Sequence, residues 1–237
     1  MSLRREDSTG VVVLRLARPP VNAIDYDTVL ALEVAFSELA QRPPATGVIL
    51  TGEGNTFSGG VDVQAFAGYD MVMRQQMVLA ITRMTAAALA IPCPLIAAIN
   101  GHALGGGFVL MLCCDYRIVV DDHDLRMGVP EARAGVPFPA GPLLILQHEV
   151  PPGLLRRLTL ASDIVSPHRL HDAGVIDLLS RRDSLMPLAR ERITTLAAQP
   201  GFAAVKQQLR GGLARELSAL AASKHDPLLD GIFLKRG

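Results

Sequence analysis

Tryptophan is absent from the chain, and aromatic residues make up only 4% of it. The core of this 237-residue chain must therefore be aliphatic and rich in alanine, which is feasible because 49% of the residues are hydrophobic. The length suits one large domain, or one domain with an appendage.

An excess of charge is also lacking, since 23 Lys and Arg residues balance 23 Asp and Glu residues. Lysine is scarce, being confined to Lys206, Lys224 and Lys235. A general nucleic-acid-binding surface normally leaves a basic excess. We therefore expect no nucleic-acid partner, although arginine could replace lysine in a local RNA-binding patch.

Cysteines are few and lie in apolar surroundings, at Cys93, Cys113 and Cys114. Their spacing suits neither a zinc site nor a disulfide framework, so buried reduced thiols in a cytoplasmic protein are expected. The N-terminal segment has no apolar signal region, and the longest apolar stretch, Ala86–Leu112, is interrupted by prolines and glycines. We expect no membrane span.

Short apolar runs alternate with helical patterns along the first 120 residues. The runs predict strands at 11–16, 48–51, 95–99 and 116–120, and the helical patterns predict helices at about 26–39, 74–90 and 107–114. Segments 52–60 and 100–107 are interpreted as glycine-bearing loops, and the chain after residue 143 as mainly helical. The pattern indicates an α/β fold.

The segment Asn100–Phe108 carries three successive glycines between a buried strand and a buried helix. Glycine lets a ligand approach the backbone, and the first N–H groups of a helix lack intrahelical partners and favour negative charge. Close packing of the helix is the alternative reason for these glycines. Since each costs about 1 kcal/mol relative to alanine inside a helix, we favour an oxyanion site.

A second loop, Gly54–Asp62, also follows a strand and precedes a helix. Gly59 and Gly60 again expose the backbone. The side chain of Asp62 is expected to cap the following helix rather than transfer protons.

Five segments together carry a family resemblance. They are FSGGVD at Phe57–Asp62, NGHALGGG at Asn100–Gly107, RPPVNA at Arg18–Ala23, CDYRI at Cys114–Ile118, and MGVPE at Met127–Glu131 followed by Gly135. In this order they resemble the crotonase superfamily, the enoyl-CoA hydratase/isomerase family, over residues 10–180.

The resemblance implies a crotonase-like spiral of repeated ββα units, here residues 1–180 with the CoA-thioester site. Residues 181–237 would form a C-terminal helical oligomerisation segment that builds a homotrimer or a dimer of trimers. Coenzyme A would enter as part of the acyl-CoA substrate, with no permanently bound cofactor.

The resemblance also assigns catalytic residues. The N–H groups of Gly59 and Gly106 would hold the thioester oxygen and stabilise an enolate. Family hydratases use two glutamates, of which this sequence keeps Glu131 and replaces the other with Val109. One carboxylate is enough to move a double bond, so we predict an enoyl-CoA isomerase. The alternatives are an enoyl-CoA hydratase and a catalytically inactive CoA-ester-binding protein.

The CoA portion is expected to contact the backbone of two segments and one basic side chain. The predicted substrate-binding residues are Asn22, Ala23, Ile24, Gly60, Val61, Asp62, Val109 and Lys206, with Arg18 as a further candidate.

The positions of the histidines do not predict a metal site. His102 is expected to be packed or solvated, and His123 to be solvated in an acidic turn. The spacing of His168 and His171 does not suit a metal pair on one helix face. His148 or Glu149 could replace the missing second carboxylate.

Overall fold

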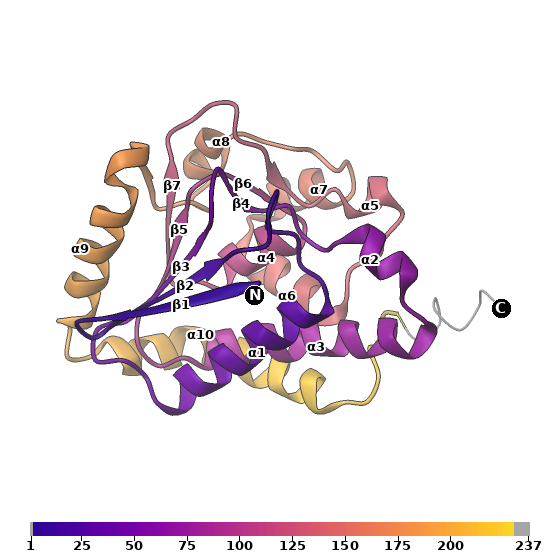
Figure 1. Ribbon diagram of the computed structural model, residues 1–237, viewed down its shortest axis with the longest axis horizontal. Coiled ribbons are helices and arrows are strands. Elements are labelled where there is room, and N and C mark those ends of the chain that lie inside the picture. The colour runs from indigo at the N-terminus through magenta and orange to yellow at the C-terminus, as the bar shows by residue number, and fades with distance from the viewer. Residues whose placement is uncertain (1, 230–237) are drawn as a thin grey trace.

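The computed structural model describes residues 2–229, which form two sheets surrounded by helices (Figure 1). The larger sheet has the strand order β1-β2-β3-β5-β7-β9, and the smaller has the order β4-β6-β8. Among the strand pairs of residues 2–229, only β1–β2 is antiparallel. The strands are β1 (Leu3–Ser8), β2 (Val11–Leu16), β3 (Gly47–Gly52), β4 (Thr56–Ser58), β5 (Leu95–Ile99), β6 (His102–Leu104), β7 (Tyr116–Val120), β8 (Met127–Gly128) and β9 (Leu178–Ser180).

The chain winds as a spiral, because successive turns give one strand to each sheet: β3 then β4, β5 then β6, and β7 then β8. The predicted strands and the α/β class are confirmed. The two segments interpreted as loops, 52–60 and 100–107, each contain a short strand as well, β4 and β6. Strands of three residues are too short for a period-2 pattern to reveal them.

The helices are α1 (Tyr26–Gln41), α2 (Val63–Gly68), α3 (Met71–Ala90), α4 (Gly106–Leu112), α5 (Glu131–Ala134), α6 (Ala140–Glu149), α7 (Pro152–Thr159), α8 (Pro167–Asp172), α9 (Leu185–Ala197) and α10 (Phe202–Ala222). Side chains of Asp25, Asp62 and Asp70 accept hydrogen bonds from the first turns of α1, α2 and α3. The predicted capping role of Asp62 is therefore confirmed.

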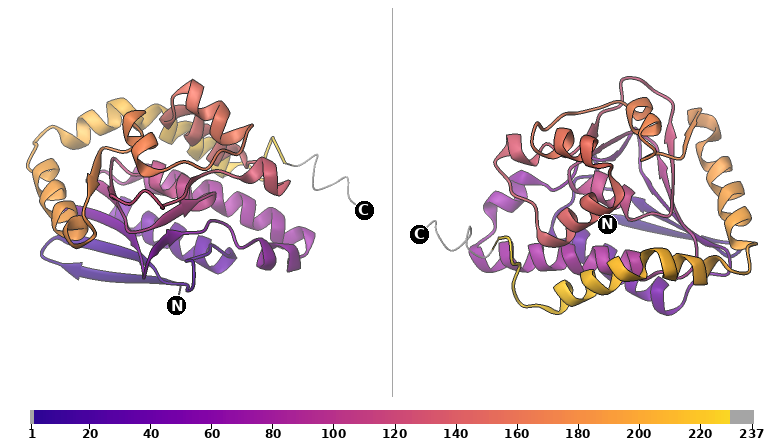
Figure 2. Two further views of the ribbon diagram at one scale, coloured as in Figure 1. Left: turned by 90° about the horizontal axis from the view of Figure 1, so that it is seen from above. Right: turned by 180° about the vertical axis from the view of Figure 1, so that it is seen from behind.

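Helices α1, α3 and α10 run side by side along one flank of the molecule, whereas α9 packs across β3, β5 and β7 (Figures 1 and 2). The C-terminal helix α10 packs against α3 and α6. The end of the described chain thus returns to the helices around the middle of the sequence.

The core is aliphatic, as the composition predicts, with Phe36, Phe57 and Phe108 as its largest fully buried side chains. Strand β1 was not predicted, because its sequence LRREDS is polar and it lies at the exposed edge of the larger sheet. Within residues 2–229, no helix is long and apolar enough to cross a membrane.

Candidate active site

A cavity of about 170 Å³ lies where the two glycine loops meet α3, α5 and the start of α6. Its walls are almost entirely apolar. Six of the predicted site residues line it: Gly59, Gly106, Glu131, Ile24, Val61 and Val109.

The two glycine loops touch directly. Gly60 has a φ of +87°, and a Cβ there would lie 2.6 Å from the carbonyl oxygen of Leu104 and 3.1 Å from the nitrogen of Gly106. A side chain at Gly60 would therefore force the loops apart, which explains why glycine is needed there.

The reason for a glycine differs among the three glycine positions before and within α4. Gly105 adopts a left-handed φ of +52°, and a Cβ on Gly107 would lie 2.7 Å from Ser58. Gly106 has neither constraint, since its nearest contacts would be ordinary ones at 3.6 Å. Close packing therefore accounts for Gly107, whereas at Gly106 the missing side chain leaves the backbone open to the cavity.

Two backbone N–H groups at the loop contact are available to a ligand. Neither Val61 nor Gly106 donates a hydrogen bond within residues 2–229, and a Cβ on Gly106 would lie 3.7 Å from the nitrogen of Val61. A pair of adjacent N–H groups beside the first turn of a helix can stabilise an oxyanion.

The prediction that Gly59 supplies one of these donors is wrong. Its N–H donates to the carbonyl oxygen of Val21 at 2.8 Å, and the N–H of Gly60 donates to Ser58 Oγ at 3.1 Å. The donor available in this loop is Val61, two residues further on.

Glu131 is the only ionisable side chain lining the cavity among the described residues. Burial raises its pKa from the ordinary 4.5 to about 7, because charge is poorly solvated there. Its Oε2 is buried without a partner among residues 2–229, and its Oε1 would lie 3.0 Å from a Cβ on Gly105. The carboxyl group thus lies beside the glycine loop, at a pKa suited to accepting and returning a proton near neutral pH.

The short helix that carries Glu131 is held from outside. Helix α5 begins after Pro130 and has no side-chain cap of its own. Ser162, buried and left-handed at φ +52°, accepts a hydrogen bond from the N–H of Arg133 at 3.1 Å, and its carbonyl oxygen accepts one from the Arg133 guanidinium at 2.8 Å. These bonds fix the first turn of α5 and therefore Glu131.

Neither His148 nor Glu149 lines this cavity. Glu149 binds Arg117 and Arg210. Burial opposes its ionisation, but the two guanidinium charges prevail and lower its pKa. A carboxylate held in this way is a poor proton donor, so neither His148 nor Glu149 replaces the second carboxylate in this cavity.

The predicted contact segment at Asn22–Ile24 serves mainly to join loops. The buried amide of Asn22 donates to Glu53 and Thr56 carbonyl oxygens at 3.0 and 2.7 Å. Ile24 forms a bridge with Val61, and Ala23 does not line the cavity. The side chain of Asn22 is therefore structural, whereas the predicted contact between the backbone of this segment and CoA stays a prediction.

Arg18 links the starts of two helices. It contacts Asp25 at 3.0 Å and Asp62 at 2.8 Å, and these aspartates cap α1 and α2. Bonding to the N–H of Ala65 and to Arg18 lowers the pKa of Asp62. Arg18 and Asp62 thus bind each other, and neither side chain lines the cavity.

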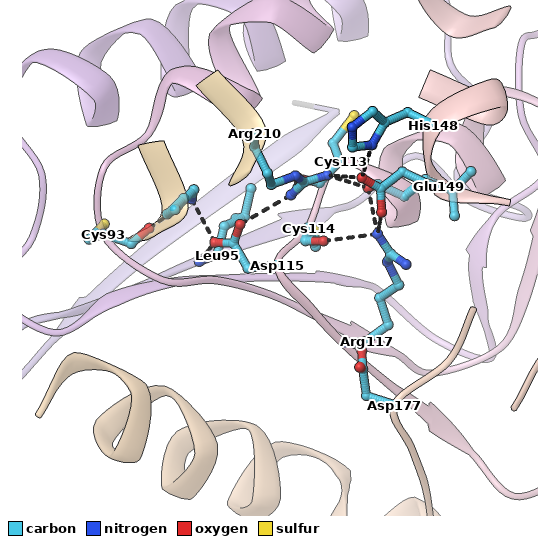
Figure 3. A network of polar contacts seen from close by, with 12 residues as sticks. Cys93, Leu95, Cys113, Cys114, Asp115, Arg117, His148, Glu149, Asp177 and Arg210 are labelled. Atoms are coloured by element: carbon cyan, nitrogen blue, oxygen red, sulfur yellow. Dashed lines mark hydrogen bonds and ion pairs between the residues drawn. The ribbon is translucent and has the colours of Figure 1, made fainter. Parts of the chain in front are cut away.

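Lys206 is not a free phosphate-binding side chain, and this prediction is wrong. It is buried and donates to Asp115 at 2.6 Å and to the Cys93 carbonyl oxygen at 3.1 Å. Asp115 also binds Arg210, which reaches Glu149, which in turn binds Arg117 (Figure 3). This network joins α10 to the core.

Asp121, His123 and His168 gather at the surface with their donor atoms within 4.8 Å of one another. The two imidazoles are stacked at 3.9 Å with an angle of 4° between their planes. Ring nitrogens in parallel planes do not converge on one tetrahedral centre. His102 is half-buried and accepts a hydrogen bond from the N–H of Arg126 at 2.9 Å.

Two N–H groups that have no acceptor among residues 2–229 and a buried carboxyl of raised pKa define a site that can stabilise an oxyanion and move a proton beside it. A sequence model described as Enoyl-CoA hydratase/isomerase matches residues 6–227. The chain therefore belongs to the enoyl-CoA hydratase/isomerase family, an enzyme family, as the motifs predict.

Individual relatives agree with this assignment. The chain is 28% identical to the crotonyl-CoA hydratase of Syntrophomonas wolfei over 184 residues, 77% of this chain and 70% of that protein. It is 30% identical to the carnitinyl-CoA dehydratase of Salmonella enteritidis over 215 residues, 88% of this chain and 80% of the relative.

Among solved structures, an enoyl-CoA hydratase/isomerase family protein from Pseudomonas syringae superposes with a TM-score of 0.84 at 24% identity. The superposition covers 93% of this chain and 95% of that one. The crotonase-like spiral fold is thus confirmed.

Proposed function

We propose that this protein moves the double bond of an enoyl-CoA thioester, with Glu131 as the single proton shuttle. The supporting observation is that Glu131 is the only ionisable side chain lining the cavity in residues 2–229, with Val109 also on its wall. A 3-enoyl thioester would be converted to the conjugated 2-enoyl form.

The proposed mechanism starts with the thioester oxygen between the N–H groups of Val61 and Gly106. Glu131 as carboxylate removes a proton from C2, and negative charge moves to the oxygen. The two N–H groups stabilise this dienolate more strongly than the neutral thioester, which lowers the barrier. Protonated Glu131 then returns the proton to C4, which leaves the double bond between C2 and C3.

Hydration is the second candidate, favoured by the names of the relatives, which are a hydratase and a dehydratase. Adding water requires a group that positions the water as well as a proton donor. Val109, 3% exposed and aliphatic, can do neither. Isomerisation needs only one proton-transferring group, and Glu131 can provide it.

The assay that separates these functions supplies the purified protein with 3-enoyl-CoA and 2-enoyl-CoA. Mass spectrometry detects addition of water, and ultraviolet absorbance detects a conjugated thioester. We expect the 3-enoyl substrate to yield a product of unchanged mass with a conjugated double bond. If the Glu131→Gln protein still converts the 2-enoyl substrate to a product heavier by one water, the assigned roles are contradicted. Binding without turnover of any thioester would instead favour a CoA-ester-binding protein.

The raised pKa of Glu131 predicts the pH dependence of activity. Because the carboxylate form is the base, kcat/KM should rise with pH through about 7 and then level off.

The free energy of unfolding should change with pH in the opposite direction to activity. The folded state keeps this proton to higher pH than the unfolded chain, so the free energy of unfolding falls between pH 4.5 and about 7. Urea unfolding at both ends of this range should show that fall in the parent protein and less of it in Glu131→Gln.

The proposed assembly is a homotrimer or a dimer of trimers in the cytoplasm, with the segment after residue 180 contributing to the contacts. Exposed apolar side chains on α10, Val205 at 59% and Leu209 at 71%, support a contact role for that helix. Sedimentation analysis measures the assembly directly.

A further inference from the structure

The C-terminal turn at residues 226–229 forms part of the cavity that the glycine loops define. Leu229 is only 2% exposed and lines the cavity together with side chains of α3 and residues at the start of α6. It lies 98 positions beyond Glu131 in the numbering, so no motif around the catalytic residues predicts it.

One carboxylate holds this turn in place. Asp226 is 4% exposed, and its Oδ1 accepts hydrogen bonds from the N–H groups of Leu228 at 2.9 Å and Leu229 at 3.2 Å. Its Oδ2 accepts one from the N–H of Ala140 at 2.9 Å. The bonds to two successive N–H groups fix the backbone from which the Leu229 side chain projects.

The bond to Ala140 joins the turn to a second part of the cavity wall. Ala140 is the first residue of α6, whose N-cap residue Pro139 provides no side-chain cap, so Asp226 supplies the negative charge that a helix start favours. Pro139 and Pro142 both line the cavity. Asp226 therefore sets the spacing between Leu229 and the start of α6.

We propose that Leu229, held by Asp226, is a specificity-determining residue that limits the length of the acyl chain. This inference rests on the proposed function in so far as the ligand is an acyl-CoA. The argument is one of volume, because the cavity measures only about 170 Å³ and its lining is apolar. Removing three carbon atoms from its wall makes room for further methylene groups of the ligand, and burying each one favours binding by about fourfold.

The test measures binding of saturated butanoyl-, hexanoyl- and octanoyl-CoA by calorimetry, which needs no turnover. Leu229→Ala should shift the preferred chain length upward by about two carbons and increase the affinity for the longer chain about fifteenfold relative to the shorter. Leu229→Phe should shift the preference downward. The side chain of the Asp226→Asn protein cannot accept all three hydrogen bonds, so its affinities for the three thioesters should differ less with chain length.

Leu228→Ala is the matched control, because Leu228 belongs to the same turn but is 46% exposed and does not line the cavity. It should keep the parent profile. If the folded Leu229→Ala and Leu229→Phe proteins both keep that profile too, the inference is wrong while the proposed function stands. If the parent protein binds none of the three thioesters, the proposed function fails and the inference falls with it.

Discussion

Glu131→Gln is expected to lower kcat by about 10²–10⁴ while leaving the affinity for acyl-CoA nearly unchanged. Glutamine keeps the shape of the side chain but cannot accept and return a proton. Because the carboxyl of Glu131 is buried with a pKa raised to about 7, the variant should also be at least as stable as the parent at pH 8. Loss of activity then reports lost chemistry and not lost structure.

The measurements are steady-state kinetics, calorimetric binding of a saturated acyl-CoA, and urea unfolding. Glu191→Gln provides a control, since Glu191 is an exposed carboxylate on α9 that does not line the cavity. It should keep parental activity. A Glu131→Gln protein that retains a tenth or more of the parental kcat would rule out Glu131 as the sole proton shuttle.

Arg210→Met is expected to lower the free energy of unfolding by about 3–5 kcal/mol. Arg210 binds Asp115 at 3.1 Å and Glu149 at 2.9 Å, and it donates to the carbonyl oxygens of Cys113 and Leu112, both at 2.9 Å. Methionine fills similar space but leaves both carboxylates with fewer partners in a buried site. Breaking one side of such a network leaves uncompensated charge, which costs more than an exposed ion pair contributes.

Urea titration at constant pH measures this loss as a lower midpoint. Arg215→Met on the same helix is the matched control, because Arg215 is exposed, and we expect a change within about 0.5 kcal/mol. A midpoint for Arg210→Met equal to that of Arg215→Met would show that the network does not stabilise the folded chain.

Local sequence signals identified the parts of the site that depend on neighbouring residues. Gly106 and Val109 follow from the strand–glycine–helix pattern together with the motif, and Glu131 follows from the Pro-Glu pair. The Gly59 prediction failed because the acceptor for its N–H is Val21 on another segment, and hydrogen-bond partners of a loop backbone cannot be deduced from its own sequence.

Contacts between residues far apart in the sequence explain the other predictions that were wrong or missing. Lys206 resembles a free lysine on a helix, but its partner Asp115 is 91 positions away in the sequence. Likewise, nothing near Asp226 indicates that its carboxylate caps a helix beginning 86 positions earlier. Elements of three residues, such as β4 and β6, escape detection because too few side chains define their period.

The bridge that Arg18 makes between Asp25 and Asp62 bears on how quickly the site can act. It fixes Asp62, the residue that follows Val61, and the Ile24–Val61 bridge adds backbone hydrogen bonds on both sides of Val61. In the proposed mechanism the Val61 nitrogen is the donor, and it is consequently oriented when the chain folds, before a thioester binds. The entropy lost in ordering this loop belongs to folding, so it does not recur as part of the barrier in each catalytic cycle.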